Sequence, residues 1–353
     1  MMSKQTTPRK VILFRAGLLI FFAAVAVIGS ALILIKQDRL VIESPEPRDG
    51  DSGLSVRFQD APIYVEEPDA AESGHRYLYD ETLGWKNIPG WNAKTVERPL
   101  KINSKGLRDH EYDYAKPEGV RRVFVLGDSF TWGYGVGNDQ IYTEVLERGL
   151  AGQPPVGSVA DKWEVLNAGV SGWGTDQEFL FLINEGFKYE PDIVVLAFYL
   201  MNDPANNASS LQYGLHKPVF ANLDLQLTNV PAPKPGSGAP EIRCQTDPLS
   251  ITMALISEMS RACRQRAVPL AVMKFGLFEM PEEAEDIAMD KAWSAAIKLV
   301  PGIHYFDLDA AFFREKLDAD HLSGGMKFFH WNPKGHQAVA RLLRGFLESE
   351  KLL

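Results

Sequence analysis

The sequence predicts an α/β domain with a mainly parallel sheet, preceded by one transmembrane helix near the N-terminus. Two observations support this prediction. An uncharged apolar segment lies at residues 16–35. From residue 122 onward, short apolar segments of strand length alternate with longer segments that are compatible with helices. This alternation is typical of a parallel sheet with helices on both faces.

Residues 16–35 read AGLLIFFAAVAVIGSALILI and contain no charged residue. Twenty helical residues span about 30 Å, the thickness of the hydrocarbon core of a bilayer. The cytoplasmic side of a membrane protein is enriched in basic residues, and residues 1–15 are basic, whereas the chain turns acidic after Arg39. We therefore expect a single-pass protein of the cell membrane. Its basic tail would be cytoplasmic and its main domain periplasmic or extracellular.

A cleaved signal peptide is the alternative for this segment. Ala24-Val25-Ala26 resembles a cleavage site, but the segment runs on for nine more positions without a charge, longer than a signal peptide needs. We favour the uncleaved anchor.

Residues 36–74 then form an acidic linker, since they contain too few apolar residues to fold alone. The chain has a net charge of −9 although its first 40 residues are basic. The acidic main body argues against nucleic acid as a partner.

The main domain is expected at residues 120–353, after a leader segment at 75–119 that packs on it. The apolar strand-like segments lie at 122–128, 163–169, 192–198, 269–275 and 303–308. Helix-compatible segments lie near 140–150, 175–187, 248–266, 281–299 and 334–349. Ligands of such sheets bind at the carboxyl ends of the strands, so the residues after each strand indicate the site. The long connection 204–247 is rich in Pro and Gly and is expected to be either a lid or disordered.

Four polar features follow these strands or precede the last helix. Ser129 lies in GDSFTWG, directly after the first strand, and the glycine-rich NAGVSGWGT follows the second. Asn202 follows the third strand, and His330 lies in FHWNPKGH just before the last helix. A hydroxyl, free backbone amides, a carboxamide and an imidazole are the groups that acyl transfer requires.

These residues, in this order, resemble the SGNH/GDSL hydrolase superfamily over about residues 120–350. The leader, with GWKNIPGW at 84–91 and INSKGLRD at 102–109, looks like that of membrane-anchored bacterial members. The resemblance implies a flavodoxin-like three-layer α/β/α sandwich and catalysis without metal or organic cofactor. It also implies roles for four residues: Ser129 as nucleophile and first oxyanion donor, Gly172 and Asn202 as the second and third donors, and His330 as general base and acid.

The chain departs from the family pattern in two places. Leu200 stands where a glycine usually precedes the Asn-Asp pair. Lys327 and Phe328 occupy the positions where an aspartate usually precedes the catalytic histidine, so the acid of the triad is missing from its expected place. Asp318 and Asp320 are the nearest candidates to replace it. They also belong to a rival D-x-x-H string ending at His321, but the residues around His330 fit the ending of the family better.

The expected function is hydrolysis of an ester through an acyl-enzyme. We expect an O-acetyl or short O-acyl group on an envelope or extracellular glycan as substrate, because the arrangement resembles proteins of bacterial polysaccharide systems. The alternatives are a lipid acyl-ester hydrolase, an O-acyltransferase and a non-catalytic glycan-binding or assembly protein.

Cys244 and Cys263 are the two cysteines, and either a disulfide or two thiols fits the sequence. The spacing of Cys and His does not suggest a metal site. Tryptophans are expected to pack, with pocket walls as the alternative for Trp132 and Trp173.

Overall fold

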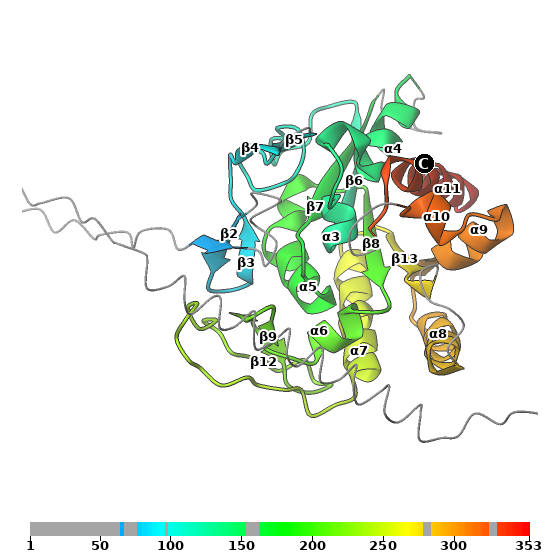
Figure 1. The fold of residues 1–353 in the computed structure, drawn as a ribbon. Helices are drawn as coiled ribbons and strands as arrows, with labels where there is room; N and C mark the ends of the chain where they lie inside the picture. The colour runs from blue at the N-terminus through cyan, green and yellow to red at the C-terminus, as the bar shows by residue number, and fades with distance from the viewer. Residues whose placement is uncertain (1–63, 67–75, 96–97, 153–161, 278–283, 325–329) are drawn as a thin grey trace, which may run out of the picture. The chain divides into compact units, whose positions relative to one another are not determined.

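A computed structural model describes residues 64–66, 76–95, 98–152, 162–277, 284–324 and 330–353 (Figure 1). The predicted cytoplasmic tail, the predicted transmembrane helix at 16–35 and most of the acidic linker lie outside these residues, so these three remain predictions. Among the described residues, no helix combines the length and the apolar character needed to cross a bilayer.

The centre of the fold is a five-stranded parallel sheet. Its strands are β6 (Val120–Gly127), β7 (Lys162–Gly169), β8 (Ile193–Tyr199), β13 (Leu270–Phe275) and β14 (Ile303–Asp307). They lie in the order β14-β13-β8-β6-β7. Counted from β6, this is the flavodoxin-like order, in which the chain reverses its direction of travel across the sheet between the first and third strands. The predicted parallel sheet is confirmed.

Helices cover both faces of this sheet (Figure 1). The first layer is formed by α5 (Thr175–Asn184), α7 (Pro248–Arg264) and α8 (Ala284–Ile297). The second is formed by α4 (Tyr142–Leu150), α9 (Leu308–Glu315) and α11 (Pro333–Ser349). All five helices predicted from the sequence are present, and α9 is an addition. Each layer buries its apolar side chains in a separate cluster with one face of the sheet.

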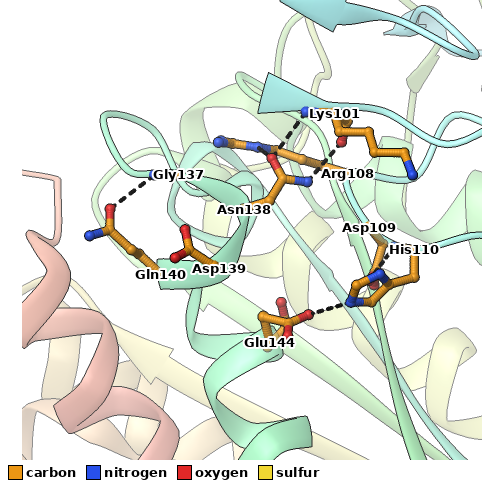
Figure 2. Close-up of a pocket in the computed structure, with 10 residues that line it drawn as sticks. Lys101, Arg108, Asp109, His110, Gly137, Asn138, Asp139, Gln140 and Glu144 are labelled. Atoms are coloured by element: carbon orange, nitrogen blue, oxygen red, sulfur yellow. Dashed lines mark hydrogen bonds and ion pairs between the residues drawn. The ribbon is translucent and has the colours of Figure 1, made fainter. Parts of the chain in front are cut away.

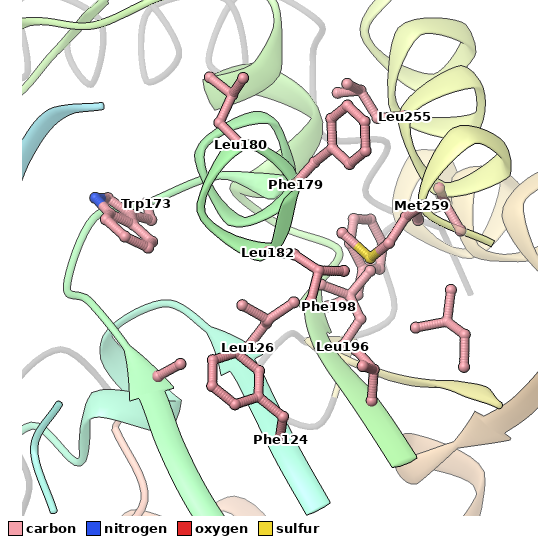
Figure 3. Packing of buried hydrophobic residues seen from close by; sticks show 14 of the residues in the cluster. Phe124, Leu126, Trp173, Phe179, Leu180, Leu182, Leu196, Phe198, Leu255 and Met259 are labelled. Atoms are coloured by element: carbon pink, nitrogen blue, oxygen red, sulfur yellow. The ribbon is translucent and has the colours of Figure 1, made fainter. Parts of the chain in front are cut away.

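Successive side chains of the central strands pack against opposite helix layers, because the side chains of a strand alternate between its two faces. Phe124 and Leu126 of β6 join Leu196 and Phe198 of β8 in the cluster under α5 and α7 (Figure 3). Val123 and Val125 point to the opposite face and pack with α4 and α11. The continuous apolar sequence of these strands is therefore explained by burial on both sides.

The leader forms small antiparallel sheets. One contains β2 (Arg76–Asp80) and β3 (Gly84–Asn87), and the other contains β4 (Asn92–Thr95) and β5 (Arg98–Lys101). A third strand of the first sheet, β1 (Tyr64–Glu66), comes from the predicted acidic linker and pairs with β2, so this part of the linker is a strand. The connection after Asn202 is also ordered. It contains α6 (Asp203–Asn207) and the two-residue strands β9 (Leu211–Gln212), β10 (Leu215–His216), β11 (Val219–Phe220) and β12 (Leu227–Thr228). The expectation of disorder there is wrong. Cys244 and Cys263 are both free thiols.

Leu196→Ala should destabilise the protein by about 2–5 kcal/mol, because the truncation leaves a cavity in a close-packed core. Leu196 is fully buried at the centre of the sheet. Leu299→Ala is the matched control: this leucine is 82% exposed, and its loss should change stability by less than about 0.5 kcal/mol. Denaturant unfolding followed by tryptophan fluorescence measures both, and equal losses would contradict the described packing.

Candidate active site

Ser129 begins α3 (Ser129–Trp132), a short helix that follows β6 after a single intervening residue. That residue, Asp128, caps the helix: its Oδ1 accepts a hydrogen bond of 2.9 Å from the backbone N–H of Phe130. The turn requires glycine at position 127, since a Cβ there would lie 2.1 Å from Oγ1 of Thr131. The strand therefore ends in a sharp turn that leaves the Ser129 hydroxyl partly accessible at the edge of the sheet.

His330 lies against Ser129. The distance from its Nε2 to the Ser129 Oγ is 2.7 Å. The imidazole ring stacks on Phe130, with ring centroids 4.6 Å apart, and a second ring, Tyr134, has its centroid 4.7 Å away. The backbone after His330 is fixed as well, because Asn332 caps α11 through the N–H groups of Lys334 and Gly335. Both the position and the orientation of the imidazole are thus constrained.

The other two predicted site residues follow the neighbouring strands. Asn202 precedes α6, and its Nδ2 donates a hydrogen bond of 3.1 Å to Oδ2 of Asp128. Gly172 lies in the loop after β7 with a φ of +78°, a left-handed conformation that favours glycine. Since β7 and β8 flank β6, the loop containing Gly172 and the turn containing Asn202 lie on either side of the Ser129 turn. This is the switch point of the sheet, where ligands of flavodoxin-like folds bind.

The structure places His330, and not His321, beside the serine. His321 is exposed on α10 (Ala319–Leu322). Asp318 caps that helix, accepting a hydrogen bond of 2.9 Å from the N–H of His321, and Asp320 is exposed. Neither carboxylate pairs with His330 among the contacts of the described residues. Positions 327 and 328, where the family usually has its aspartate, lie outside the described residues.

Asp128 belongs to a cluster of buried acids that the sequence analysis missed. Burial raises the pKa of Asp128 to about 6, although hydrogen bonds from Phe130 and Asn202 act in the opposite direction. Glu178 of α5 and Asp203 of α6 are fully buried, and desolvation raises the pKa of both carboxyls well above the usual range. Repulsion from Asp128 and from other buried acids raises both further. Neither carboxylate oxygen of Glu178 has a hydrogen-bond partner among the described residues. A helical glutamate gives no signal in the sequence that would place it there.

The leader contacts both loops of the site. Arg108 is buried and donates hydrogen bonds to the carbonyls of Trp132, Gly133 and Val136, at the end of α3 and just beyond it. Trp85 donates to the carbonyl of Ser171 in the loop after β7. The sequence analysis assigned no such role to the leader. Trp132 and Trp173 are 2% and 0% exposed, so they pack inside the protein and do not line an open pocket.

A cavity of about 550 Å³ lies between the leader and the segment from Gly137 to Glu144 (Figure 2). On its wall, one ligand atom from each of Asp109, His110 and Glu144 lies within 4.8 Å of the others, a spacing that a metal ion would accept. These groups already have protein partners, however. Asp109 accepts hydrogen bonds from the backbone N–H groups of His110 and Asn167, and Glu144 pairs with His110 and Arg148. The cluster is explained by its role in joining the leader to α4.

Comparison with known proteins gives a family match. Residues 125–338 match the GDSL-like lipase/acylhydrolase family. No curated protein matches the sequence. Similar solved structures include the α/β hydrolase LAE5 from the metagenome of Lake Arreo, Spain, with 17% identity and a TM-score of 0.44 over 67% of this chain and 97% of that chain. The acetylxylan esterase Axe2 from Geobacillus stearothermophilus has 15% identity and a TM-score of 0.44 over 64% and 94%. Similarity at this level identifies no substrate.

Asp128→Asn should lower the catalytic rate without lowering the stability of the protein at pH 8. The Oδ1 of the new side chain can still cap α3. Its N–H₂ group faces the N–H₂ group of Asn202, and because both are hydrogen-bond donors, the Asn202 amide must turn away. We expect kcat for p-nitrophenyl acetate to fall about 100-fold, the usual effect of losing one oxyanion donor. Asp224→Asn, at an exposed aspartate, is the control and should leave kcat unchanged.

The same substitution should raise the free energy of unfolding at pH 8. The pKa of Asp128 is about 6 in the folded protein, whereas an unfolded aspartate has a pKa of about 3.9. The folded state therefore binds the proton more tightly, and this residue lowers stability as the pH rises from about 4 to about 6 and keeps it lowered above that range. Denaturant unfolding at pH 5 and pH 8 measures the difference. A less stable variant at pH 8 would contradict the assignment.

Proposed function

The chain belongs to the GDSL-like lipase/acylhydrolase family and is an ester-bond hydrolase, and we propose that it acts through a covalent acyl-enzyme formed on Ser129. The observation that supports this mechanism is the 2.7 Å contact between the Ser129 Oγ and the His330 Nε2. A serine hydroxyl is a weak nucleophile until a base takes its proton, and an imidazole at hydrogen-bonding distance is suited to this task.

In the first half of the reaction, the Ser129 Oγ attacks the ester carbonyl while His330 takes the hydroxyl proton. The carbonyl oxygen becomes negatively charged and receives hydrogen bonds from the N–H groups of Ser129 and Gly172 and from Nδ2 of Asn202. When the tetrahedral intermediate collapses, His330 returns the proton to the leaving alcohol. In the second half, His330 takes a proton from water, whose oxygen attacks the acyl carbon. When this second tetrahedral intermediate collapses, the bond to the Ser129 Oγ breaks, His330 returns the proton to that oxygen, and the acid is released.

Asp128 supports the role of Asn202. A carboxamide N–H₂ group has two hydrogens, and one of them is donated to the Oδ2 of Asp128. This contact fixes the plane of the amide, so the second hydrogen keeps one direction. A donor that is oriented before the reaction needs no reorganisation when charge develops on the substrate, which is the basis of oxyanion stabilisation.

For the substrate, we propose an O-acetyl or short O-acyl group on an envelope or extracellular glycan. Tyr213 supports this choice. Its ring lies next to Gly172, with Cε2 only 2.7 Å from where a Cβ on that glycine would be, and the residue is 54% exposed. An exposed aromatic ring beside the oxyanion donors offers an apolar surface against which the C–H face of a sugar ring can pack.

We further propose that residues 16–35 anchor the protein in the cell membrane with the N-terminus in the cytoplasm. The hydrolase domain would then be periplasmic or extracellular, and the acidic linker at residues 36–74 would hold it away from the bilayer. The uncharged apolar segment and the basic residues before it support this arrangement.

Ser129→Ala and His330→Ala should each lower kcat for p-nitrophenyl acetate by about 10³-fold or more, because each removes a group without which the acyl-enzyme forms slowly. The full chain, purified in detergent, is the enzyme to assay. Ser257→Ala is the control, since that serine is exposed on α7 and bonds only within its own helix. Activity that survives Ser129→Ala would contradict the mechanism.

The substrate assignment is tested with the same preparations. Release of acetate from an O-acetylated polysaccharide should exceed release of fatty acid from a phospholipid, and only the Ser129-containing protein should support it. Faster release of fatty acid would indicate a lipid acyl-ester hydrolase. Acetyl transfer to an added sugar that outpaces the appearance of free acetate would indicate an acyltransferase.

The membrane topology predicts the behaviour of reporter fusions. Alkaline phosphatase fused after residue 353 should be active, because the enzyme matures only outside the cytoplasm, and the fusion should remain in the membrane fraction. A β-galactosidase fusion at the same position should be inactive. The reverse pattern would overturn the topology, and an active fusion released from the membrane would indicate a cleaved signal peptide.

A further inference from the structure

We propose that Trp85, in strand β3 of the leader, is a positioning residue that sets the direction of the Gly172 N–H, the second oxyanion donor. The inference rests on the proposed function, because it assumes that this N–H receives the developing negative charge. It gives the leader, which precedes the region matched by the family, a defined part in the reaction.

The contact that supports the proposal joins two groups of one peptide unit. The indole Nε1 of Trp85 donates a hydrogen bond of 3.1 Å to the carbonyl oxygen of Ser171. That carbonyl and the N–H of Gly172 belong to the same peptide plane, and in a trans peptide they point in opposite directions. When the indole holds the oxygen on the leader side, the N–H must therefore point to the other side of the plane.

This peptide needs an external constraint. Gly172 has a φ of +78°, and a glycine has access to a wider range of backbone conformations than any other residue. Rotation of the whole Ser171–Gly172 peptide plane would turn the N–H away from the side opposite the indole without moving the rest of the loop. The ring of Tyr213 packs on one side of Gly172, and Cζ2 of Trp85 lies 3.5 Å from where a Cβ would be. The tryptophan contributes both contact area and the hydrogen bond that selects one orientation.

Trp85 is itself held in place. It is 1% exposed, and its own carbonyl accepts a hydrogen bond of 2.9 Å from Nε1 of Trp173, so the two tryptophans tie β3 to the loop in both directions. Two residues further along β3, Nδ2 of Asn87 donates to the carbonyls of Gly169 and Gly106, at 3.2 and 3.0 Å. Strand β3 thus contacts the loop near its start, middle and end. The contacts at Gly169 and Trp173 hold the two ends of the loop, and the contact at Ser171 is the one that opposes rotation of the peptide between them.

The hydrogen bond also acts on the donor strength of the peptide. A carbonyl that accepts a hydrogen bond polarises its peptide group and makes the N–H at the other end a better donor. Loss of a whole oxyanion donor costs about 10²–10³-fold in rate. Loss of its orientation, with the N–H still present, should cost less, and we expect about a tenfold decrease in kcat.

Trp85→Phe tests the proposal, because it keeps an aromatic ring in the core and removes only the indole N–H and part of the ring. In the full chain with p-nitrophenyl acetate, kcat should fall about tenfold while KM changes less than about twofold. An interaction that strengthens only in the transition state lowers kcat and kcat/KM equally. A general loss of packing would not produce this pattern.

Trp293→Phe is the matched control. Trp293 is fully buried in α8 and stacks on Phe198, and its Nε1 has no hydrogen-bond partner among the described residues. The two variants lose the same atoms from the core, but only Trp85→Phe loses a hydrogen bond to the loop that contains Gly172. Trp293→Phe should keep the kcat of the unmodified protein. Equal effects of the two substitutions would overturn the proposal.

A second variant covers the case in which Trp85→Phe does not fold. Replacing Trp85 with 3-benzothienylalanine exchanges the N–H for sulfur and keeps the shape of the ring, and kcat should again fall about tenfold at constant KM. Unchanged kcat would overturn the inference and leave the proposed mechanism standing. Activity that does not depend on Ser129, shown by Ser129→Ala, would overturn both, so the two failures are distinguishable.

Discussion

The buried carboxylate of Asp128 joins two of the strand ends that form the site. One of its oxygens caps the helix that begins with Ser129, and the other holds the amide of Asn202. A buried charge is costly unless it is compensated by hydrogen bonds, and here the two hydrogen bonds come from the residue after Ser129 and from Asn202. Glu178 and Asp203 increase the cost by placing further acids nearby. The geometry of the site is thus maintained at the expense of stability, as is common at functional sites.

The sheet and the leader contribute different kinds of groups. The strands end in loops that carry Ser129, Gly172 and Asn202, whereas the leader supplies hydrogen-bond donors to the carbonyls of two of those loops. Arg108 binds carbonyls at the end of α3, and its burial lowers the pKa of the guanidinium to about 9, still well above neutrality. Trp85 and Asn87 do the same for the loop after β7. The residues that hold these loops therefore extend before residue 125, where the family match begins.

Local patterns explain which parts were predictable from the sequence. Strands buried on both faces read as continuous apolar segments, and helix-compatible segments separate them, so the sheet and its layers could be predicted. The residues after the strands and before the last helix indicated Ser129, Asn202 and His330, and the resemblance to the SGNH/GDSL family singled out Gly172. The hydrogen bonds of Trp85 and Arg108 join residues that are distant in the chain, and no periodicity records them. The order in the connection after Asn202 was likewise missed, because its short strands pair without an apolar repeat.

The hydrogen bond between Ser129 and His330 joins residues 201 positions apart. A ribosome therefore produces the serine long before the imidazole, and the last helix must be complete before the ring is held in place. During most of its synthesis the chain therefore carries Ser129 without His330, and the contact between them can form only when the C-terminal helix docks. Docking of α11 is thus the step that brings the imidazole to the serine.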